Sequence, residues 1–198
     1  MITFRNVLCD AAWLAWACLA ITVNVDAASE KVLFAFQGNT NSPVWQIVND
    51  DVMGGVSTSR FQVLTNGGAV FSGVVSMENR GGFASVRSSP VRDNLNGCET
   101  FVLRVRGDGR RYKFTVRTET GFNAPNYQAE FTTQRGEWEE YRLAFKDFVP
   151  TFRGRILTDV PPLNPAKVAT VGFLISDRQD GAFKLEVAWI KASALSGK

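Results

Sequence analysis

The feature of this sequence that most constrains its fold is a period of two in the hydrophobic pattern. Phe101, Leu103 and Val105 are separated by Val102 and Arg104. The same alternation recurs further along the chain, over residues 112–117, 127–132, 140–145 and 183–189. A period of two is typical of antiparallel strands with one buried face and one solvent-exposed face. The sequence therefore predicts an all-β protein.

Other segments of the pattern complete the predicted β structure. Further strands are predicted at Val32–Phe36, Trp45–Val48, Arg60–Leu64, Val70–Met77, Phe83–Arg87 and Val171–Ile175. Asn66-Gly67-Gly68 and Gly107-Asp108-Gly109 stand between strands and supply the positive φ that tight hairpins require. About ten antiparallel strands at this spacing predict a β-sandwich or jelly roll.

The longest irregular segment is predicted at Val149–Ala166, which contains four prolines. A loop of this length is uncommon in a compact domain, and such loops tend to be functional. Arg153 and Arg155 lie in this segment and are candidate binding residues.

Residues 1–27 have the features of a secretory signal peptide. Arg5 precedes an apolar run from Ala11 to Val23, which is shorter than the roughly 20 residues that a membrane-spanning helix needs. Val25-Asp26-Ala27 provides small residues at the positions that signal peptidase reads. We expect cleavage after Ala27, a single domain over residues 28–198 and a periplasmic or secreted location. An uncleaved membrane anchor is the alternative.

The chain contains no histidine among its 198 residues. This absence excludes Ser-His-Asp and Cys-His nucleophile systems, His-ligated zinc and any imidazole acid or base. Cys98 has no general base to activate it, so it is expected to be a small buried hydrophobe. We expect no enzyme activity, no cofactor and no metal site. The net charge of +3 is too small to predict a nucleic-acid partner, and any membrane association is expected to be peripheral.

The most distinctive motif is the acidic, glycine-containing run that follows the predicted Trp45 strand. The candidate binding residues in it are Asn49, Asp50, Asp51, Met53, Gly54, Gly55 and Ser57. Its oxygens have two interpretations. They either bind a cation or sugar hydroxyls, or they form an Asx-type turn in which the carboxylates accept neighbouring backbone N–H groups.

A second polar loop, Glu78-Asn79-Arg80-Gly81-Gly82-Phe83, also ends in paired glycines. Asn79 and Arg80 either contact a ligand, or Arg80 pairs with Asp50 or Asp51 in a structural clasp.

Charged and polar side chains also occupy the solvent-facing positions of three consecutive predicted strands. They are Arg104, Arg106, Lys113, Arg117, Gln128 and Glu130, with Asp108 in the turn after the first strand. On three adjacent strands they would share one surface, which is either solvated cross-strand pairing or a docking face for a partner. Trp45 has two interpretations of its own, as an aromatic platform for a sugar or as part of the core.

Several of these motifs resemble one family in their order along the chain. The matching segments are Asn49–Ser57, Glu78–Arg87, Arg106–Gly109, Gly136–Trp138, Phe152–Arg155 and Gly172–Asp177. Over about residues 33–191 the chain resembles the 30 kDa complex I intermediate-associated protein family. The resemblance implies a galactose-binding-like β-sandwich without catalytic residues.

The resemblance also implies a protein-binding assembly or chaperone-like factor, with complex I subunits or assembly intermediates as partners. The alternative is an exported carbohydrate-binding module of the cell envelope, which would hold sugar through Asp50, Asp51, Asn79, Arg80 and Trp45.

Overall fold

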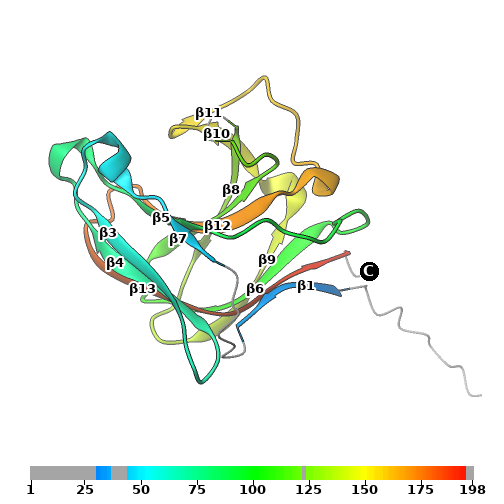
Figure 1. Cartoon of the computed structure of the whole chain (residues 1–198), viewed down its shortest axis with the longest axis horizontal. Coiled ribbons are helices and arrows are strands. Elements are labelled where there is room, and N and C mark those ends of the chain that lie inside the picture. The colour runs from blue at the N-terminus through cyan, green and yellow to red at the C-terminus, as the bar shows by residue number, and fades with distance from the viewer. Residues whose placement is uncertain (1–29, 37–43, 122–123, 195–198) are drawn as a thin grey trace, which may run out of the picture.

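Thirteen antiparallel strands form two sheets in the part of the chain described by the computed structural model, which covers residues 30–36, 44–121 and 124–194. Figure 1 shows the two sheets as the layers of a sandwich. The predicted signal peptide and its cleavage site at Ala27 lie outside the described residues. No helix among the described residues has the length and apolar character needed to cross a membrane.

The six-stranded sheet is organised around the long C-terminal strand β13. Its members are β1 (Glu30–Ala35), β3 (Thr58–Val63), β4 (Ala69–Val75), β6 (Thr100–Arg106), β9 (Trp138–Ala144) and β13 (Gly181–Ser193). The strand order is β3-β4-β13-β6-β9. One edge of β13 pairs first with β4 and then with β1, while its other edge pairs with β6.

The seven-stranded sheet contains the strands on which the candidate site lies. Its members are β2 (Gln46–Ile47), β5 (Ala84–Arg87), β7 (Arg111–Arg117), β8 (Asn126–Thr132), β10 (Val149–Phe152), β11 (Arg155–Ile156) and β12 (Thr170–Ile175). The order is β11-β10-β8-β7-β12-β5-β2.

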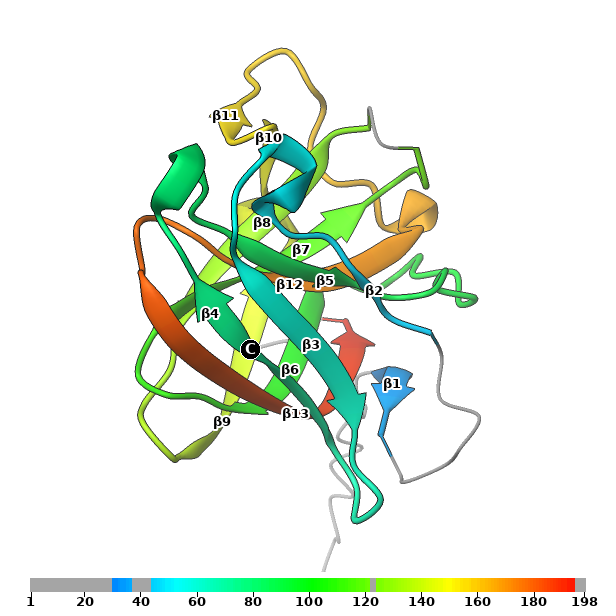
Figure 2. The same ribbon diagram turned by 60° about the vertical axis from the view of Figure 1, so that its left-hand side comes forward.

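Four short 3-10 helices complete the described elements. They are η1 (Asp50–Met53), η2 (Glu78–Arg80), η3 (Phe145–Asp147) and η4 (Pro165–Lys167). Figures 1 and 2 both place η1 and η2 at the same end of the sandwich as the β10–β11 hairpin. Three segments that are far apart in the sequence therefore meet at this end.

The core lies between the two sheets and is rich in aromatic rings. Phe101 of β6 packs edge to face on Phe114 of β7, with ring centroids 5.1 Å apart, and Phe114 lies 5.4 Å from Phe173 of β12. All three side chains are fully buried, as the period-two pattern predicted. Cys98 is also buried, which confirms its expected role as a small hydrophobe. The all-β sandwich prediction is thus confirmed.

Two local predictions differ from the structure. The turn Asn66-Gly67-Gly68 closes the β3–β4 hairpin as expected, with both glycines at positive φ. Gly107-Asp108-Gly109 does not close a hairpin, because β6 and β7 belong to different sheets and this segment carries the chain across the sandwich. The segment Val149–Ala166 is not wholly irregular, since it contains the paired strands β10 and β11.

The packing predicts the stability of a core variant. Phe101→Ala removes a fully buried ring that contacts residues of both sheets, so we expect a loss of about 3–5 kcal/mol in the free energy of unfolding, measured by urea denaturation. Gln62→Ala on exposed β3 is the control and should change stability by less than about 0.5 kcal/mol. A loss for Phe101→Ala no larger than that of the control would contradict this packing.

Candidate functional site

Asp50 is a fully buried carboxylate that joins two distant loops. Its Oδ1 accepts a hydrogen bond from the Ser57 amide at 2.9 Å. Its Oδ2 accepts hydrogen bonds from the Ser57 hydroxyl, the Gly82 amide at 2.6 Å and the Phe83 amide at 3.2 Å. The segment after β2 is thereby tied to the segment before β5, more than thirty residues away.

One glycine of each paired-glycine motif makes room for this carboxylate. A Cβ atom on Gly55 would lie 2.4 Å from the Asp50 Cγ, and one on Gly81 would lie 2.5 Å from the Asp50 Oδ2. Burial by itself raises the pKa of the Asp50 carboxyl, but the hydrogen bonds from Ser57, Gly82 and Phe83 outweigh it and hold the pKa below its usual value. Asp50 is therefore a buried, ionised anchor.

The neighbours of Asp50 in the motif have the same structural role. Asn49 Oδ1 accepts hydrogen bonds from the Ser59 hydroxyl at 2.7 Å and the Ser85 amide at 3.3 Å. Gly54 ends η1 in the left-handed region at a φ of 88°, where a side chain would be strained. The oxygens of Asn49 and Asp50 accept backbone N–H groups seven to thirty-six residues away, so their role is structural but they do not form the local Asx-type turn.

The predicted clasp between Arg80 and Asp50 or Asp51 is not formed, and backbone amides of the same loop hold Asp50 instead. The described residues contain no ion pair between Arg80 and either Asp50 or Asp51, and Gly82 and Phe83 donate to Asp50 instead. Asn79 and Arg80 are exposed and have positive φ values of 52° and 62°. Trp45 stacks on Phe61 at 4.4 Å and packs on the core, so its ring is not free to form a sugar platform.

The predicted common surface of charged strands is wrong. Arg104 and Arg106 lie on β6 in the six-stranded sheet, whereas Lys113, Arg117, Gln128 and Glu130 lie on β7 and β8 in the seven-stranded sheet. Because the outward faces of a sandwich point in opposite directions, the two groups are on opposite sides of the molecule. The prediction failed because strands that are consecutive in the sequence are not adjacent in one sheet here.

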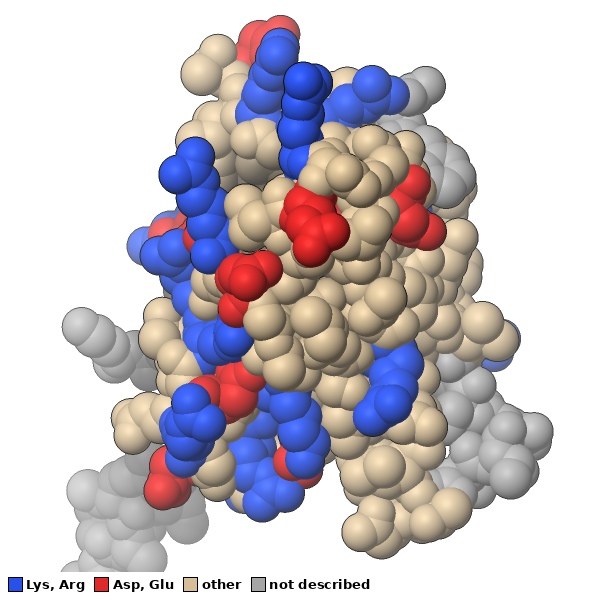
Figure 3. Space-filling view, turned by 90° about the vertical axis from the view of Figure 1, so that its left-hand side faces the viewer, with Lys and Arg blue, Asp and Glu red and all other residues tan. Residues whose placement is uncertain are grey.

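The outer face of the six-stranded sheet is covered by paired charges. Arg104 forms an ion pair with Glu140 at 3.2 Å, Arg106 forms one with Glu186 at 2.6 Å, and both guanidinium groups lie over the Trp138 ring. In Figure 3, charged side chains of both signs gather along one margin, while uncharged residues make up most of that view. Cross-strand pairing accounts for this face.

Asp108 also has a structural role, at the crossing between the sheets. Its carboxylate accepts hydrogen bonds from the Tyr112 hydroxyl and the Lys184 amide, both at 2.9 Å. Burial, together with the charge of Asp108, raises the pKa of the Tyr112 hydroxyl well above its usual range. These bonds hold the β6–β7 crossing against β13.

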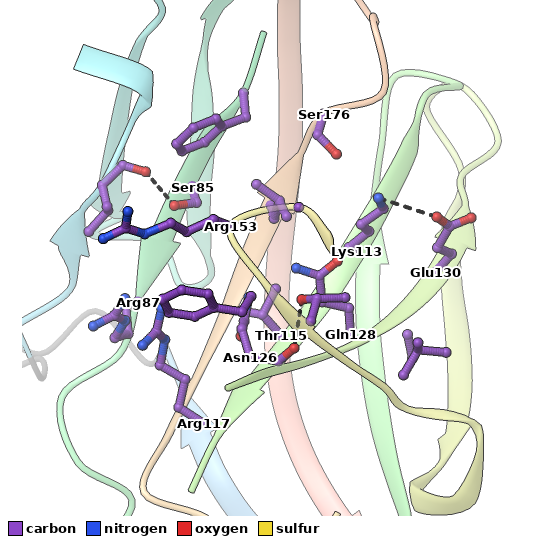
Figure 4. Close-up of a pocket in the computed structure, with 18 of the residues that line it drawn as sticks. Ser85, Arg87, Lys113, Thr115, Arg117, Asn126, Gln128, Glu130, Arg153 and Ser176 are labelled. Atoms are coloured by element: carbon purple, nitrogen blue, oxygen red, sulfur yellow. Dashed lines mark hydrogen bonds and ion pairs between the residues drawn. The ribbon is translucent and has the colours of Figure 1, made fainter. Parts of the chain in front are cut away.

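The outer face of the seven-stranded sheet is hollowed into a cleft of about 920 Å³. Strands β5, β7, β8 and β12 form its floor (Figure 4). Val52 and Met53 of η1 line one side, and Phe152, Arg153 and Ile156 of the β10–β11 hairpin line another. The Asp50 anchor therefore fixes one side of the cleft.

The strand register arranges the floor residues in three rows that run across the sheet. One row contains Ser85, Leu174, Lys113 and Glu130. The next row contains Arg87, Gly172, Thr115, Gln128 and Val149. The third row contains Thr170, Arg117, Asn126 and Thr151.

Charge is distributed unevenly along this floor. In the first row, Lys113 Nζ lies 2.8 Å from an oxygen of Asp177 and 3.4 Å from one of Glu130, so its charge is compensated. In the other rows Arg87 and Arg117 face the cleft, with Arg153 on the same side of it (Figure 4). Burial, reinforced by the charge of Arg87, lowers the pKa of Arg117 to about 10, so it remains a cation at neutral pH. This end of the cleft is basic.

Only some of the candidate residues proposed from the sequence line the cleft. Met53 and Arg153 line it, as do Lys113, Arg117, Gln128 and Glu130 of the charged strands, whereas Arg155 does not. Asp51 is exposed beside the buried Asp50. Further residues line the cleft that the sequence had not indicated, although they occupy outward-facing strand positions, among them Arg87, Thr115, Asn126 and Thr170.

Metal-ligating side chains do not cluster at the cleft or elsewhere in the described residues, where no group of three or more Asp, Glu or Cys could hold a metal ion.

Comparison with known families gives one match over most of the chain. The family model of complex I intermediate-associated protein 30 (CIA30) matches residues 34–187. A mouse protein named "Complex I intermediate-associated protein 30, mitochondrial" is 28% identical over 180 residues, which cover 81% of this chain and 55% of that protein. The Drosophila melanogaster protein of the same name is 25% identical over 181 residues, covering 80% and 61%. The chain thus spans little more than half the length of these relatives.

These names correct one expectation from the sequence. The relatives are named as mitochondrial proteins, which contradicts the periplasmic or secreted location. The short apolar run after Arg5 was too unspecific a signal to assign a compartment.

Solved structures confirm the fold. The family 11 carbohydrate-binding module of a Clostridium thermocellum cellulosomal cellulase superimposes with a TM-score of 0.62 at 16% identity, covering 85% of this chain and 96% of the module. The agarase AgWH50C gives a TM-score of 0.57 at 10% identity, covering 83% of this chain and 24% of the enzyme. At these identities the likeness concerns the sandwich architecture alone.

The contacts of Asp50 predict that two adjacent carboxylates differ in their effect on stability. Asp50→Asn replaces an acceptor by an amide that faces buried N–H donors, so we expect it to lower the free energy of unfolding by about 3 kcal/mol at pH 7. Asp51→Asn, at an exposed position, should change stability by less than about 0.5 kcal/mol. Chemical denaturation of both variants gives the comparison.

The same pair of variants tests the pKa of Asp50. Because the pKa of Asp50 in the folded protein lies below its usual value, the stabilisation is complete above the unfolded pKa and is lost as the pH falls through the folded pKa. The difference in the free energy of unfolding between the wild-type protein and Asp50→Asn should therefore be constant from pH 7 to about pH 5 and shrink below about pH 4. Equal losses of stability in Asp50→Asn and Asp51→Asn would contradict the anchor role of Asp50.

Proposed function

The chain belongs to the complex I intermediate-associated protein 30 family, and on this basis we propose that it is a non-enzymatic, protein-binding factor in complex I assembly. The names of the relatives describe association with complex I intermediates. We propose complex I subunits or assembly intermediates as its partners, and the cleft on the seven-stranded sheet as the surface that binds them.

The observation that carries this proposal is the exposure of apolar side chains around the cleft. Val52 and Met53 are 66% and 65% exposed on one side, and Ile156 is 69% exposed on the other. Exposed apolar side chains that border a concave surface favour an interaction site. Val52 and Met53 belong to the turn fixed by Asp50, so they are presented to a partner with little loss of conformational entropy on binding.

The opposite face of the molecule also exposes apolar side chains, Val74 and Trp138, but its arginines are paired with carboxylates. The arginines of β6 are engaged in ion pairs with Glu140 and Glu186, which is typical of a solvated sheet surface. This difference between the two faces favours the cleft as the docking surface.

The charges in the cleft support a binding role over a catalytic one. Glu130 and Asp177 both contact Lys113. Burial raises the pKa of the Asp177 carboxyl, but the hydrogen bonds and charge of Lys113 more than compensate and lower it below its usual value. A carboxyl with a lowered pKa is ionised at neutral pH and is a poor general acid.

The carbohydrate-binding alternative required Trp45 as an aromatic platform. Trp45 packs between Phe34, Phe61 and Phe173, which favours the protein-binding proposal over that alternative.

A bulky side chain on the cleft floor tests the proposal. In cells that lack the endogenous chain, tagged full-length Gln128→Trp should co-purify complex I subunits at least about tenfold less than the wild-type protein does, because the indole fills the centre of the cleft. Gln62→Trp on the exposed face of β3 is the matched control and should retain the interaction. Normal capture and normal complex I levels with Gln128→Trp would refute the cleft as the docking surface.

A further inference from the structure

Two polar side-chain atoms at the basic end of the cleft are buried and have no hydrogen-bond partner. They are Thr170 Oγ1 and Asn126 Oδ1, and both residues line the cleft. Thr170 is only 4% exposed. A buried polar atom without a partner costs about 1–3 kcal/mol, so such atoms require an explanation.

The strand register places these two residues on either side of a half-buried cation. Thr170 of β12 and Asn126 of β8 are the two cross-strand neighbours of Arg117 on β7. Arg117 is held in position because its Nη1 donates to the carbonyls of Gly121 at 3.0 Å and Ala124 at 3.3 Å. The two unpaired atoms and the fixed guanidinium group therefore form one row on the cleft floor.

Positive charge accumulates at this row and beside it (Figure 4). Figure 4 shows the guanidinium groups of Arg87 and Arg117 close together, with Arg153 on the same side of the cleft. The positive charge of Arg87 adds to the effect of burial in lowering the pKa of Arg117. Within the described part of the chain, neither Arg117 nor Arg153 forms an ion pair with an Asp or Glu.

We propose, on the basis of the function proposed above, that the cleft binds an acidic peptide segment of the partner protein. The basic subsite, defined here as Arg87, Arg117, Asn126, Arg153 and Thr170, receives a carboxylate of that segment. A carboxylate accepts hydrogen bonds from arginine and from the Thr170 hydroxyl, and a peptide N–H donates to Asn126 Oδ1.

The chemistry of the subsite favours this occupant over a neutral one. An uncharged sugar would supply partners for Thr170 and Asn126, but it would leave the charges of Arg117 and Arg153 uncompensated. The apolar side chains of Val52, Met53 and Ile156 around the cleft suit the non-acidic residues of a peptide.

Binding of a defined peptide pair to the full chain tests the charge requirement. Hexaglutamate, with hexaglutamine as the uncharged counterpart, is titrated into the wild-type protein and two variants by calorimetry. Arg153→Gln should raise the Kd for hexaglutamate about tenfold, because a charge-assisted hydrogen bond is lost. Arg155→Gln removes the same charge from the same hairpin at a residue that does not line the cleft, so its Kd should stay within about twofold of the wild-type value.

A second variant separates the subsite from general electrostatic attraction. Thr170→Val keeps the shape and charge of the site but removes the unpaired hydroxyl. We expect weaker hexaglutamate binding by about fivefold, together with an unchanged or higher Tm, because no intramolecular hydrogen bond is lost. A purely structural hydroxyl would instead lower the Tm and leave the Kd unchanged.

Several outcomes would overturn the inference. Equal Kd values for hexaglutamate and hexaglutamine, or for Arg153→Gln and Arg155→Gln, would remove the acidic-peptide requirement. Preferential binding of a neutral β-1,3-1,4-linked tetrasaccharide that is insensitive to Arg153→Gln would assign the cleft to carbohydrate.

The two proposals fail separately. If Gln128→Trp abolishes capture of complex I subunits while Arg153→Gln changes neither capture nor the Kd, only the acidic-peptide inference fails. If the Kd for hexaglutamate depends on Arg153 while Gln128→Trp leaves capture and complex I levels normal, only the proposed function fails.

Discussion

The buried carboxylate of Asp50 is the interaction on which the functional end of the molecule depends. It accepts hydrogen bonds from the Ser57 side chain and amide and from the amides of Gly82 and Phe83, and so locks the loop after β2 to the loop before β5. A fully desolvated charge is stable only when it is surrounded by donors in this way. The requirement explains one glycine in each pair, because a Cβ on Gly55 or Gly81 would collide with the carboxylate.

This anchor connects stability to binding. The turn that carries Asp50 also carries Val52 and Met53, whose side chains point into solvent beside the cleft. Rigid scaffolds that hold exposed side chains in a fixed arrangement are common in recognition, because little conformational entropy is lost on binding. A change at Asp50 would therefore disturb binding indirectly, through the position of the cleft wall, and not through a lost contact with the partner.

The two faces of the sandwich divide the charged residues into two functions. On the six-stranded sheet, arginines are neutralised by glutamates on neighbouring strands. On the seven-stranded sheet, the arginines of the basic subsite gather beside the unpaired oxygens of Thr170 and Asn126. The crossing at Asp108 separates these groups, because it sends β6 and β7 to different sheets.

The sequence by itself determined most of the strands, the inward-facing core and the motif that identifies the family, because alternation and glycine placement are local properties of the chain. It did not determine which strands are neighbours, since sheet pairing depends on contacts between residues far apart in sequence. Only the tertiary structure decided that Asp50 is buried while Asp51 is exposed, and that Arg104 and Arg117 lie on opposite faces. The cleft has the same origin, because its floor combines outward-facing residues of four strands whose adjacency no local pattern records.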